Sequence, residues 1–247
     1  MWRVIIVFIL VFAVTPAIAS HKFYVIHGYA NPKTVMEKIN KTIKKEHFFT
    51  ENYAYTSIVE DLDSLGLDLY QDIIKADVDT VSFVTHSMGA LVFRSMLKYI
   101  VTDKKFPVIY RIVMIAPPNS GAEIADFFKS DKFTKMVLGP NVEHMRTDSS
   151  SYANELPVPY NMEIGIIIGI RGKDKGYNPF IQGDNDGLLT PERTFLGNEK
   201  DVVVLHLDHA AVTQKKSVLH LVVEFLKYGE FVSKDKYQIK LITEEEI

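Results

Sequence analysis

A serine stands where an apolar run gives way to a helical pattern, in the stretch VSFVTHSMGALVF that covers residues 81–93. A serine on a sharp turn between a buried strand and a helix, with small residues two positions away on each side, is typical of a nucleophile elbow, usually written G-x-S-x-G. Thr85 takes the first small position and Gly89 the second. The plain alternative is a serine that caps a helix. The strand before it and the helix after it favour Ser87 as a nucleophile.

A serine hydroxyl becomes a nucleophile only with a base beside it, a group that orients the base, and donors for the oxyanion. The stretch VVVLHLDHAAV offers two histidines as the base. His206 lies inside a predicted strand, where a lone histidine is more often a core residue. His209 follows the end of that strand, in the loop before the last predicted helix. We therefore expect His209 to be the base and His206 to be structural.

The orienting acid is sought in the loop GDNDGLLTPERT, which holds Asp184 and Asp186. An acidic loop rich in glycine and asparagine is most often a turn and sometimes a calcium loop. Asp186 precedes Gly187 and two leucines that would return the chain to apolar packing. We therefore expect Asp186 to be the acid, with Asp184 as the alternative.

The donors for the oxyanion are expected from two backbone N–H groups. Gly28 follows the short apolar run FYVIH, and a glycine there lets the backbone turn sharply and aim the N–H of Tyr29 into the site. Met88 directly follows the serine at a helix start, so its N–H is the second expected donor. His27 precedes Ser87 in the chain and is expected to brace this loop by hydrogen bonds rather than to act as the base.

Strand-like apolar runs alternate with helix-length segments along the chain. The predicted strands cover residues 23–28, 52–59, 80–85, 108–116, 162–170 and 201–207. The predicted helices cover residues 34–46, 65–76, 89–101 and 217–229. Strands rich in valine and isoleucine, each followed by a helix, indicate a mostly parallel sheet covered on both faces. Such a sheet would bring the loops named above together, because ligands lie at the carboxyl ends of parallel strands.

The segment 117–161 interrupts this rhythm, and we expect it to form a small helical cap. Within it, residues 123–138 carry apolar side chains at helical spacing, with Phe127, Phe128 and Phe133 on one predicted face. This face is either a lid that could line an acyl groove or a packed surface helix.

Composition narrows the class of protein further. The chain has 247 residues, a net charge of −3 and no cysteine. The charge gives no argument for nucleic acid, and the absence of cysteine excludes disulfides, thiol nucleophiles and zinc–thiolate sites. We expect one domain over residues 20–247, a monomer, and no metal or organic cofactor.

The first 19 residues are typical of a secretory signal peptide. Arg3 is followed by an apolar run up to Val14, and Ala17-Ile18-Ala19 provides a small-x-small cleavage site. A retained membrane anchor is the alternative, but the apolar run is shorter than the roughly 20 residues of a spanning helix. We therefore expect cleavage near Ser20, no stable membrane span afterwards, and a periplasmic or secreted protein.

Four stretches together resemble a known group of proteins. They are FVTHSMGALVFRSML, RIVMIAPPNSGAEIAD, DNDGLLTPERT and LDHAAVTQ. They are similar to the THSMGG elbow, APPNxGSE turn, DDGxVxxERT acid loop and late histidine of compact secreted or periplasmic lipase- and esterase-like α/β hydrolases of bacteria. The likeness runs from Phe23 to Phe231. It departs at Ala90, where a second glycine is usual, and at Ala210-Ala211, where bulkier residues are common; both departures concern the shape of the acyl pocket.

The resemblance implies a catalytic triad of Ser87 as nucleophile, Asp186 as acid and His209 as base, in the chain order of the α/β-hydrolase fold. The expected function is hydrolysis of a small-molecule or lipid carboxylic ester through an acyl-enzyme. One alternative is an acyltransferase or thioesterase with the same triad. Another is a hydrolase fold without catalysis, used for binding.

Overall fold

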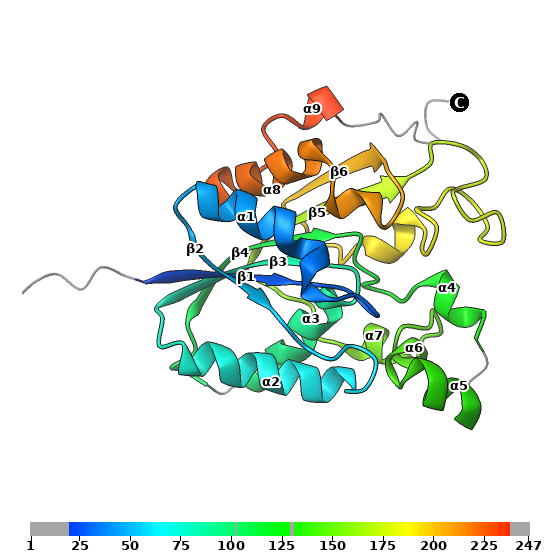
Figure 1. The fold of residues 1–247 in the computed structure, drawn as a ribbon, viewed down its shortest axis with the longest axis horizontal. Helices are drawn as coiled ribbons and strands as arrows, with labels where there is room; N and C mark the ends of the chain where they lie inside the picture. The colour runs from blue at the N-terminus through cyan, green and yellow to red at the C-terminus, as the bar shows by residue number, and fades with distance from the viewer. Residues whose placement is uncertain (1–19, 102, 129–130, 238–247) are drawn as a thin grey trace, which may run out of the picture.

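The computed structural model describes residues 20–101, 103–128 and 131–237. Six strands form one sheet in the order β2-β1-β3-β4-β5-β6, and neighbouring strands are parallel throughout (Figure 1). The strands are β1 (His21–Ile26), β2 (Phe49–Tyr53), β3 (Thr80–His86), β4 (Val108–Ile115), β5 (Glu163–Ile170) and β6 (Asp201–His206). The predicted parallel sheet is confirmed. The predicted signal peptide lies outside the described residues.

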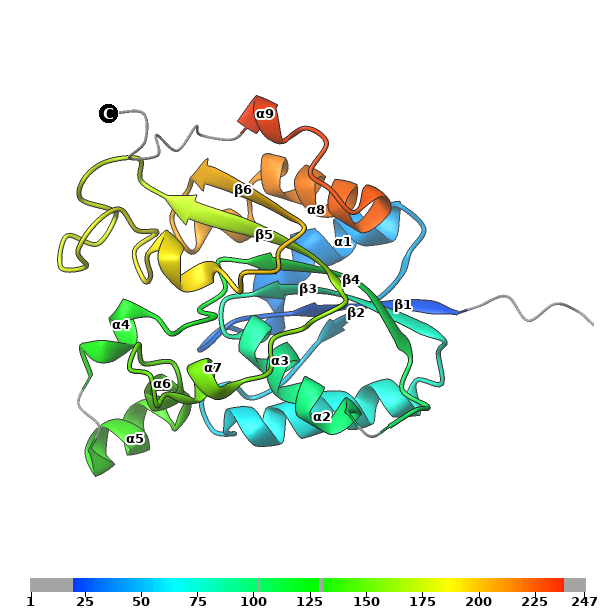
Figure 2. The ribbon, with the colours of Figure 1, turned by 180° about the vertical axis from the view of Figure 1, so that it is seen from behind.

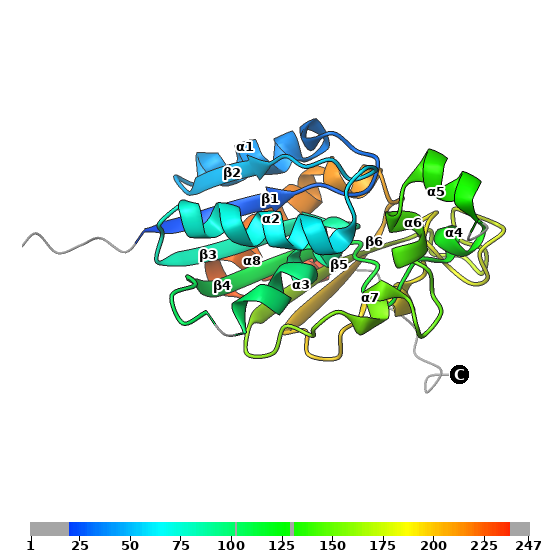
Figure 3. The same ribbon diagram turned by 90° about the horizontal axis from the view of Figure 1, so that it is seen from below.

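Helices cover both faces of this sheet. α1 (Glu37–Lys45) and α8 (Lys216–Tyr228) pack on one face, and α2 (Leu62–Lys75) and α3 (Gly89–Ile100) pack on the other (Figures 1 and 3). β5 is buried at every position after Glu163. A parallel strand with helices on both sides has no wet face, which is why its sequence lacks polar alternation.

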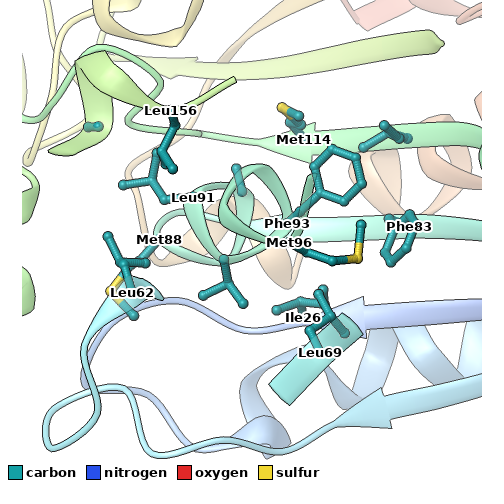
Figure 4. Close-up of a cluster of buried hydrophobic side chains, with 14 of the residues drawn as sticks. Ile26, Leu62, Leu69, Phe83, Met88, Leu91, Phe93, Met96, Met114 and Leu156 are labelled. Carbon is teal, nitrogen blue, oxygen red and sulfur yellow. The ribbon is translucent and has the colours of Figure 1, made fainter. Parts of the chain in front are cut away.

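α3 is fixed by apolar contacts to both the sheet and α2. Phe93 of α3 packs against Phe83 of β3, with ring centroids 4.8 Å apart. Met96 of α3 belongs to the same buried cluster as Leu62 and Leu69 of α2 (Figure 4). Full burial of each such side chain contributes about 1.5–3 kcal/mol. The helix that begins just after Ser87 therefore has a fixed position.

β2 lies earlier in the chain than the sequence predicts. The predicted strand over 52–59 is wrong beyond Tyr53, because the next residues leave the sheet. Tyr55 donates its hydroxyl to the His27 carbonyl at 2.5 Å, and Ser57 Oγ accepts the N–H of Ala30 at 2.9 Å. These polar contacts hold the segment against the loop after β1 rather than in the sheet.

The insertion 117–161 forms a cap of short helices beside the carboxyl ends of the strands (Figure 2). They are α4 (Glu123–Asp126), α5 (Lys132–Leu138), α6 (Asn141–His144) and α7 (Tyr152–Glu155). The predicted helical cap is present. The prediction of one continuous amphipathic stretch over 123–138 is wrong. The described residues there divide between α4 and α5, and α5 buries none of its side chains.

Short helical turns complete the described chain. They are η1 (Lys33–Met36), η2 (Pro191–Thr194), η3 (Ala211–Thr213) and α9 (Lys234–Tyr237). α8 ends at Gly229, whose φ of +74° is the left-handed conformation that glycine adopts most easily. The predicted end of this helix is confirmed.

Candidate active site

Ser87 lies at the carboxyl end of β3, between His86, the last residue of the strand, and the start of α3. Its φ of +52° is in the left-handed region, where a non-glycine residue is strained. Its N–H donates to the Ile115 carbonyl at the end of β4, at 2.9 Å. The chain thus makes the sharp strand-to-helix turn that the sequence predicts, with the serine at its apex.

The neighbours of this turn approach it closely. A Cβ on Gly28 would lie 2.8 Å from the Cβ of Ser87, and a Cβ on Gly89 would lie 2.6 Å from the His27 carbonyl oxygen. Real Cβ atoms do not approach other atoms so closely, so both positions require glycine. The loop after β1 therefore touches the turn that holds Ser87.

The two expected oxyanion donors lie on these touching segments. Met88 caps the start of α3, and Tyr29 follows Gly28 in the loop after β1. Within the described residues, neither N–H group donates to another backbone carbonyl. The first N–H groups of a helix have no partner inside the helix and carry the positive end of its dipole. Both groups are free to bind an anion.

His27 braces the loop that carries Tyr29, as the sequence predicts. Its ring is 1% exposed and stacks on Tyr55, with centroids 4.1 Å apart. Its Nδ1 donates to the Gly28 carbonyl at 2.9 Å. Burial lowers the pKa of His27.

Asp186 and His209 meet at the carboxyl ends of β5 and β6. His209 Nδ1 lies 2.6 Å from Asp186 Oδ2, and the His209 N–H donates to the Asp186 carbonyl at 2.9 Å. Asp186 is 2% exposed, and its Oδ1 accepts the N–H groups of Leu188 at 2.9 Å and Leu189 at 3.1 Å. The carboxylate is therefore fixed by its own loop and by the imidazole together.

Neither alternative residue joins this pair. Asp184 accepts the N–H groups of Arg171 at 3.0 Å and Gly172 at 2.8 Å, so it closes the loop after β5. His206 is exposed at the end of β6, and its Nδ1 donates to the Arg171 carbonyl at 3.0 Å. The expectation that His206 lies in the core is wrong, because β6 is the outermost strand on this side of the sheet and the ring turns toward the loop at Arg171.

His86 is a further histidine at the site that sequence reasoning missed. It is 1% exposed, and its Nε2 donates to the His209 carbonyl at 3.0 Å. The rings of His86 and His209 have centroids 4.9 Å apart. His209 therefore lies beside the residue that precedes Ser87. Its position directly before Ser87 in THSMG is the only feature of the sequence that indicates a place for His86 at the site.

Known proteins resemble this chain in structure but not in sequence. No protein-family model matches it, and no curated protein does. The mature lipase BlEst2 of Bacillus licheniformis matches with a TM-score of 0.62 at 16% identity, over 87% of this chain and 93% of its own. The phospholipase PlaB of Legionella pneumophila matches with a TM-score of 0.64 at 14% identity, over 89% of this chain and 62% of its own. The type II thioesterase BorB from the borrelidin biosynthetic cluster matches with a TM-score of 0.52 at 12% identity, over 86% of this chain and 93% of its own.

Together with the six-stranded parallel sheet and its covering helices, these structural matches establish the fold. The chain has the α/β-hydrolase fold.

The cap of this α/β-hydrolase fold is tied to both sides of the site. The Tyr29 hydroxyl donates to the Leu138 carbonyl at the end of α5. The N–H of Ile124 in α4 donates to the Leu188 carbonyl at 3.0 Å, two residues after Asp186. The cap therefore contacts the loop with the expected oxyanion donor and the loop with the expected acid.

Arg94 joins the two ends of the cap to α3. Its side chain is buried, and it donates to the carbonyls of Asn119 at 2.6 Å, Leu156 at 2.7 Å and Pro157 at 3.1 Å. Burial lowers the pKa of Arg94 to about 10, so the guanidinium stays charged at neutral pH. The base of the cap is thus fixed to the helix that begins beside Ser87.

A cavity of about 540 Å³ lies beside His209. Its lining includes Val35, Tyr177, Leu188, Ala210 and Thr213. The aromatic residues that the sequence suggested for an acyl groove lie elsewhere. Phe127 and Phe128 line a cavity of about 780 Å³ in the cap, together with several charged residues, and Phe133 is 69% exposed.

Neither a metal-binding cluster nor a membrane-spanning helix is found in the part of the chain that the structure describes. No cluster of three or more histidine, aspartate or glutamate side chains there has the arrangement of a metal site. No helix there combines the length and the apolar character needed to cross a bilayer.

Proposed function

We propose that this protein is a serine hydrolase that cleaves carboxylic esters through an acyl-enzyme. Ser87 is the nucleophile, His209 the base, and Asp186 the acid that orients the base. The N–H groups of Tyr29 and Met88 bind the oxyanion. The observation that carries the proposal is the 2.6 Å contact between His209 Nδ1 and Asp186 Oδ2, in a histidine whose carbonyl is held by His86, the residue before the strained turn at Ser87.

The hydrogen bond to Asp186 selects one tautomer of His209. An ionised carboxylate only accepts hydrogen bonds, so the proton lies on Nδ1. In the neutral ring, Nε2 then carries no proton and can accept one from a hydroxyl group. This is the state that a general base requires before it acts on serine.

Acylation and deacylation use the same residues in turn. His209 Nε2 takes the Ser87 proton while Oγ bonds to the ester carbonyl carbon, and the carbonyl oxygen becomes an oxyanion bound by the two N–H groups. His209 then returns the proton to the leaving alcohol as the carbon–oxygen bond of the ester breaks. A water molecule attacks the acyl-enzyme with His209 again as base, which releases the acid and restores Ser87.

Short to medium acyl chains are the proposed substrates. The cavity beside His209 offers apolar side chains such as Val35 and Leu188, and each buried methylene would contribute up to about 0.8 kcal/mol until the cavity is filled. The exposed Phe133 on α5 adds no enclosed surface. We expect a preference for such esters over long triglycerides, and no cleavage of peptides.

The experiment is hydrolysis of p-nitrophenyl esters of rising chain length by wild type and by Ser87→Ala. We expect kcat/KM to peak at short or medium chains and activity to be lost in Ser87→Ala, while circular dichroism shows the same fold. Unchanged turnover in Ser87→Ala would overturn the proposal. A maximum at the longest chains, with a rise in rate at an emulsion surface, would contradict the proposed substrate range.

Thioester hydrolysis or acyl transfer is the second candidate. The thioesterase BorB shares the fold at a TM-score of 0.52, and the triad chemistry differs only in the leaving group or in the acceptor. Assays with an acyl thioester, and with an added alcohol in place of water, separate these activities by their products.

We also propose that the protein is exported and that residues 1–19 are removed. The support is the sequence pattern alone: Arg3, the apolar run, and the small residues before Ser20. N-terminal sequencing of the protein outside the cytoplasm should begin at or near Ser20. A sequence that begins at Met1 in a membrane fraction would indicate an anchor instead.

A further inference from the structure

The histidine before Ser87 has a hydrogen bond that determines where its proton lies. His86 Nε2 is 3.0 Å from the His209 carbonyl oxygen. A carbonyl oxygen only accepts, so Nε2 must carry the proton and donate it. Nδ1 of His86 is buried and has no hydrogen-bond partner among the described residues. The ring is thus a neutral donor with one specific target.

The sheet alone does not fix the distance between Ser87 and His209. β3 and β6 are separated by β4 and β5, so no strand pairing joins the two loops that carry these residues. The loop after β6 is anchored further along, where Val212 is buried and Gln214 donates to the Val35 carbonyl at 2.8 Å, but that hydrogen bond is not with β3. Among the described residues, the hydrogen bond that joins this loop directly to the end of β3 comes from His86.

Hydrogen bonds from two directions hold the backbone of His209. Its N–H donates to the Asp186 carbonyl at 2.9 Å, which places it on the acid loop. Its carbonyl accepts from His86, a residue 123 positions earlier and directly bonded to Ser87. The first bond sets His209 against the acid, and the second sets it against the residue that precedes the nucleophile.

We propose that His86 is a positioning residue, whose Nε2–H holds the backbone of His209 at the distance from Ser87 that proton transfer requires. The inference rests on the proposed function of Ser87 and His209. His86 is the last residue of β3 and directly precedes Ser87, so a donor at this position acts on the loop after β6 from beside the serine.

The test compares two amide side chains that differ by one methylene. The amide nitrogen of glutamine reaches about as far as His86 Nε2, whereas that of asparagine reaches only about as far as Nδ1. We expect His86→Gln to keep kcat within about threefold of wild type. We expect His86→Asn to lower kcat about 10- to 100-fold with KM changed less than about threefold, because a small displacement of a catalytic group has effects of this size.

Val222→Ala is the control for a general loss of stability, since Val222 is buried in α8 on the far face of the sheet from α3. This variant should lower the melting temperature and leave kcat per folded molecule unchanged. Equal kcat in His86→Gln and His86→Asn would overturn the proposal. A loss of kcat in His86→Asn that is no larger than the loss in Val222→Ala, when the two variants have the same melting temperature, would also overturn the proposal.

A measurement on the wild type covers the case in which the variants do not fold. Nitrogen-15 NMR of histidine-labelled protein should show His86 as the neutral tautomer with its proton on Nε2. A proton on Nδ1 would overturn the proposal without any substitution. If the wild type hydrolyses no ester and Ser87 does not react with a fluorophosphonate, the proposed function fails instead, so the two failures are distinguishable.

Discussion

Two aspartates of one loop, Asp184 and Asp186, have different hydrogen-bond partners. Asp186 directs Oδ2 to His209 and uses Oδ1 to accept two N–H groups of its own loop. Asp184 directs both oxygens to the backbone after β5. Only Asp186 contacts a group that could move a proton, although the two residues are two positions apart.

Asp186→Asn should therefore cost far more activity than Asp184→Asn. An amide at position 186 favours the wrong tautomer of His209, and in a comparable triad this change lowers kcat by roughly 10⁴. Asp184→Asn should mainly lower the melting temperature, because it weakens the hydrogen bonds to Arg171 and Gly172. Steady-state kinetics with thermal melts checks both. A larger loss of kcat in Asp184→Asn would show that the acid has been misassigned.

The sequence could predict the pairing of Asp186 with His209, because each follows a strand that ends at the same edge of the sheet. It could not predict the partners of His86 and Arg94. Both side chains donate to backbone carbonyls of residues distant in the chain, and those carbonyls carry no residue-specific signal. A hydrogen bond to the backbone is set by the final path of the chain and leaves no trace in residue type.

The cap is hydrogen-bonded to α3 and to two loops of the site. Arg94 donates to carbonyls at both ends of the cap. Hydrogen bonds of Tyr29 and Ile124 connect the cap to the loops of the site. α5 differs, because none of its side chains is buried. Any movement of the cap should be confined to the part of α5 before Leu138, because the Leu138 carbonyl is held by Tyr29 and the base of the cap by Arg94.

Arg94→Met should loosen the cap. It removes three hydrogen bonds and leaves buried carbonyls without partners, which we expect to lower the free energy of unfolding by roughly 2–4 kcal/mol. Limited proteolysis should cut the segment 117–161 faster in this variant. Arg146→Met is the matched control, since Arg146 is partly exposed and contacts residues inside the cap only. Equal rates of cleavage in both variants would contradict the role assigned to Arg94.

The break between α4 and α5 shows why the cap was predicted less well than the sheet. Apolar spacing continues across 123–138, but the side chain of Asp131 accepts the N–H of Thr134 at 2.8 Å and starts a new helix there. Periodicity alone does not detect such a restart. The sheet was easier to predict, because long valine- and isoleucine-rich runs have one stable arrangement between two layers of helices.

Burial favours the neutral form of several histidines across the molecule. Burial lowers the pKa of His86 to about 3, with a smaller contribution from the nearby His209. Burial also lowers the pKa values of His21, His27 and His144. Below the ordinary histidine pKa of 6.5, the unfolded chain binds protons at these positions that the folded chain does not bind. Acid therefore favours unfolding.

The free energy of unfolding should fall as the pH is lowered from 6.5 toward 4. One histidine that is neutral when folded and protonated when unfolded contributes a slope of up to about 1.4 kcal/mol per pH unit. His86→Gln removes that contribution while it keeps the donor, so its slope should be smaller than that of wild type. Urea denaturation at several pH values measures both slopes. Identical slopes would mean that His86 is not a buried neutral group.

Mass-spectrometric mapping of the adduct that a fluorophosphonate forms with the protein tests directly whether Ser87 is the nucleophile. The probe reacts with an activated serine and leaves an ordinary hydroxyl unmodified. We expect a single adduct on Ser87, absent from Ser87→Ala and formed far more slowly in His209→Ala and Asp186→Asn. An unmodified wild-type protein, or an adduct on another serine with Ser87 untouched, would contradict the assignment of Ser87 as the nucleophile.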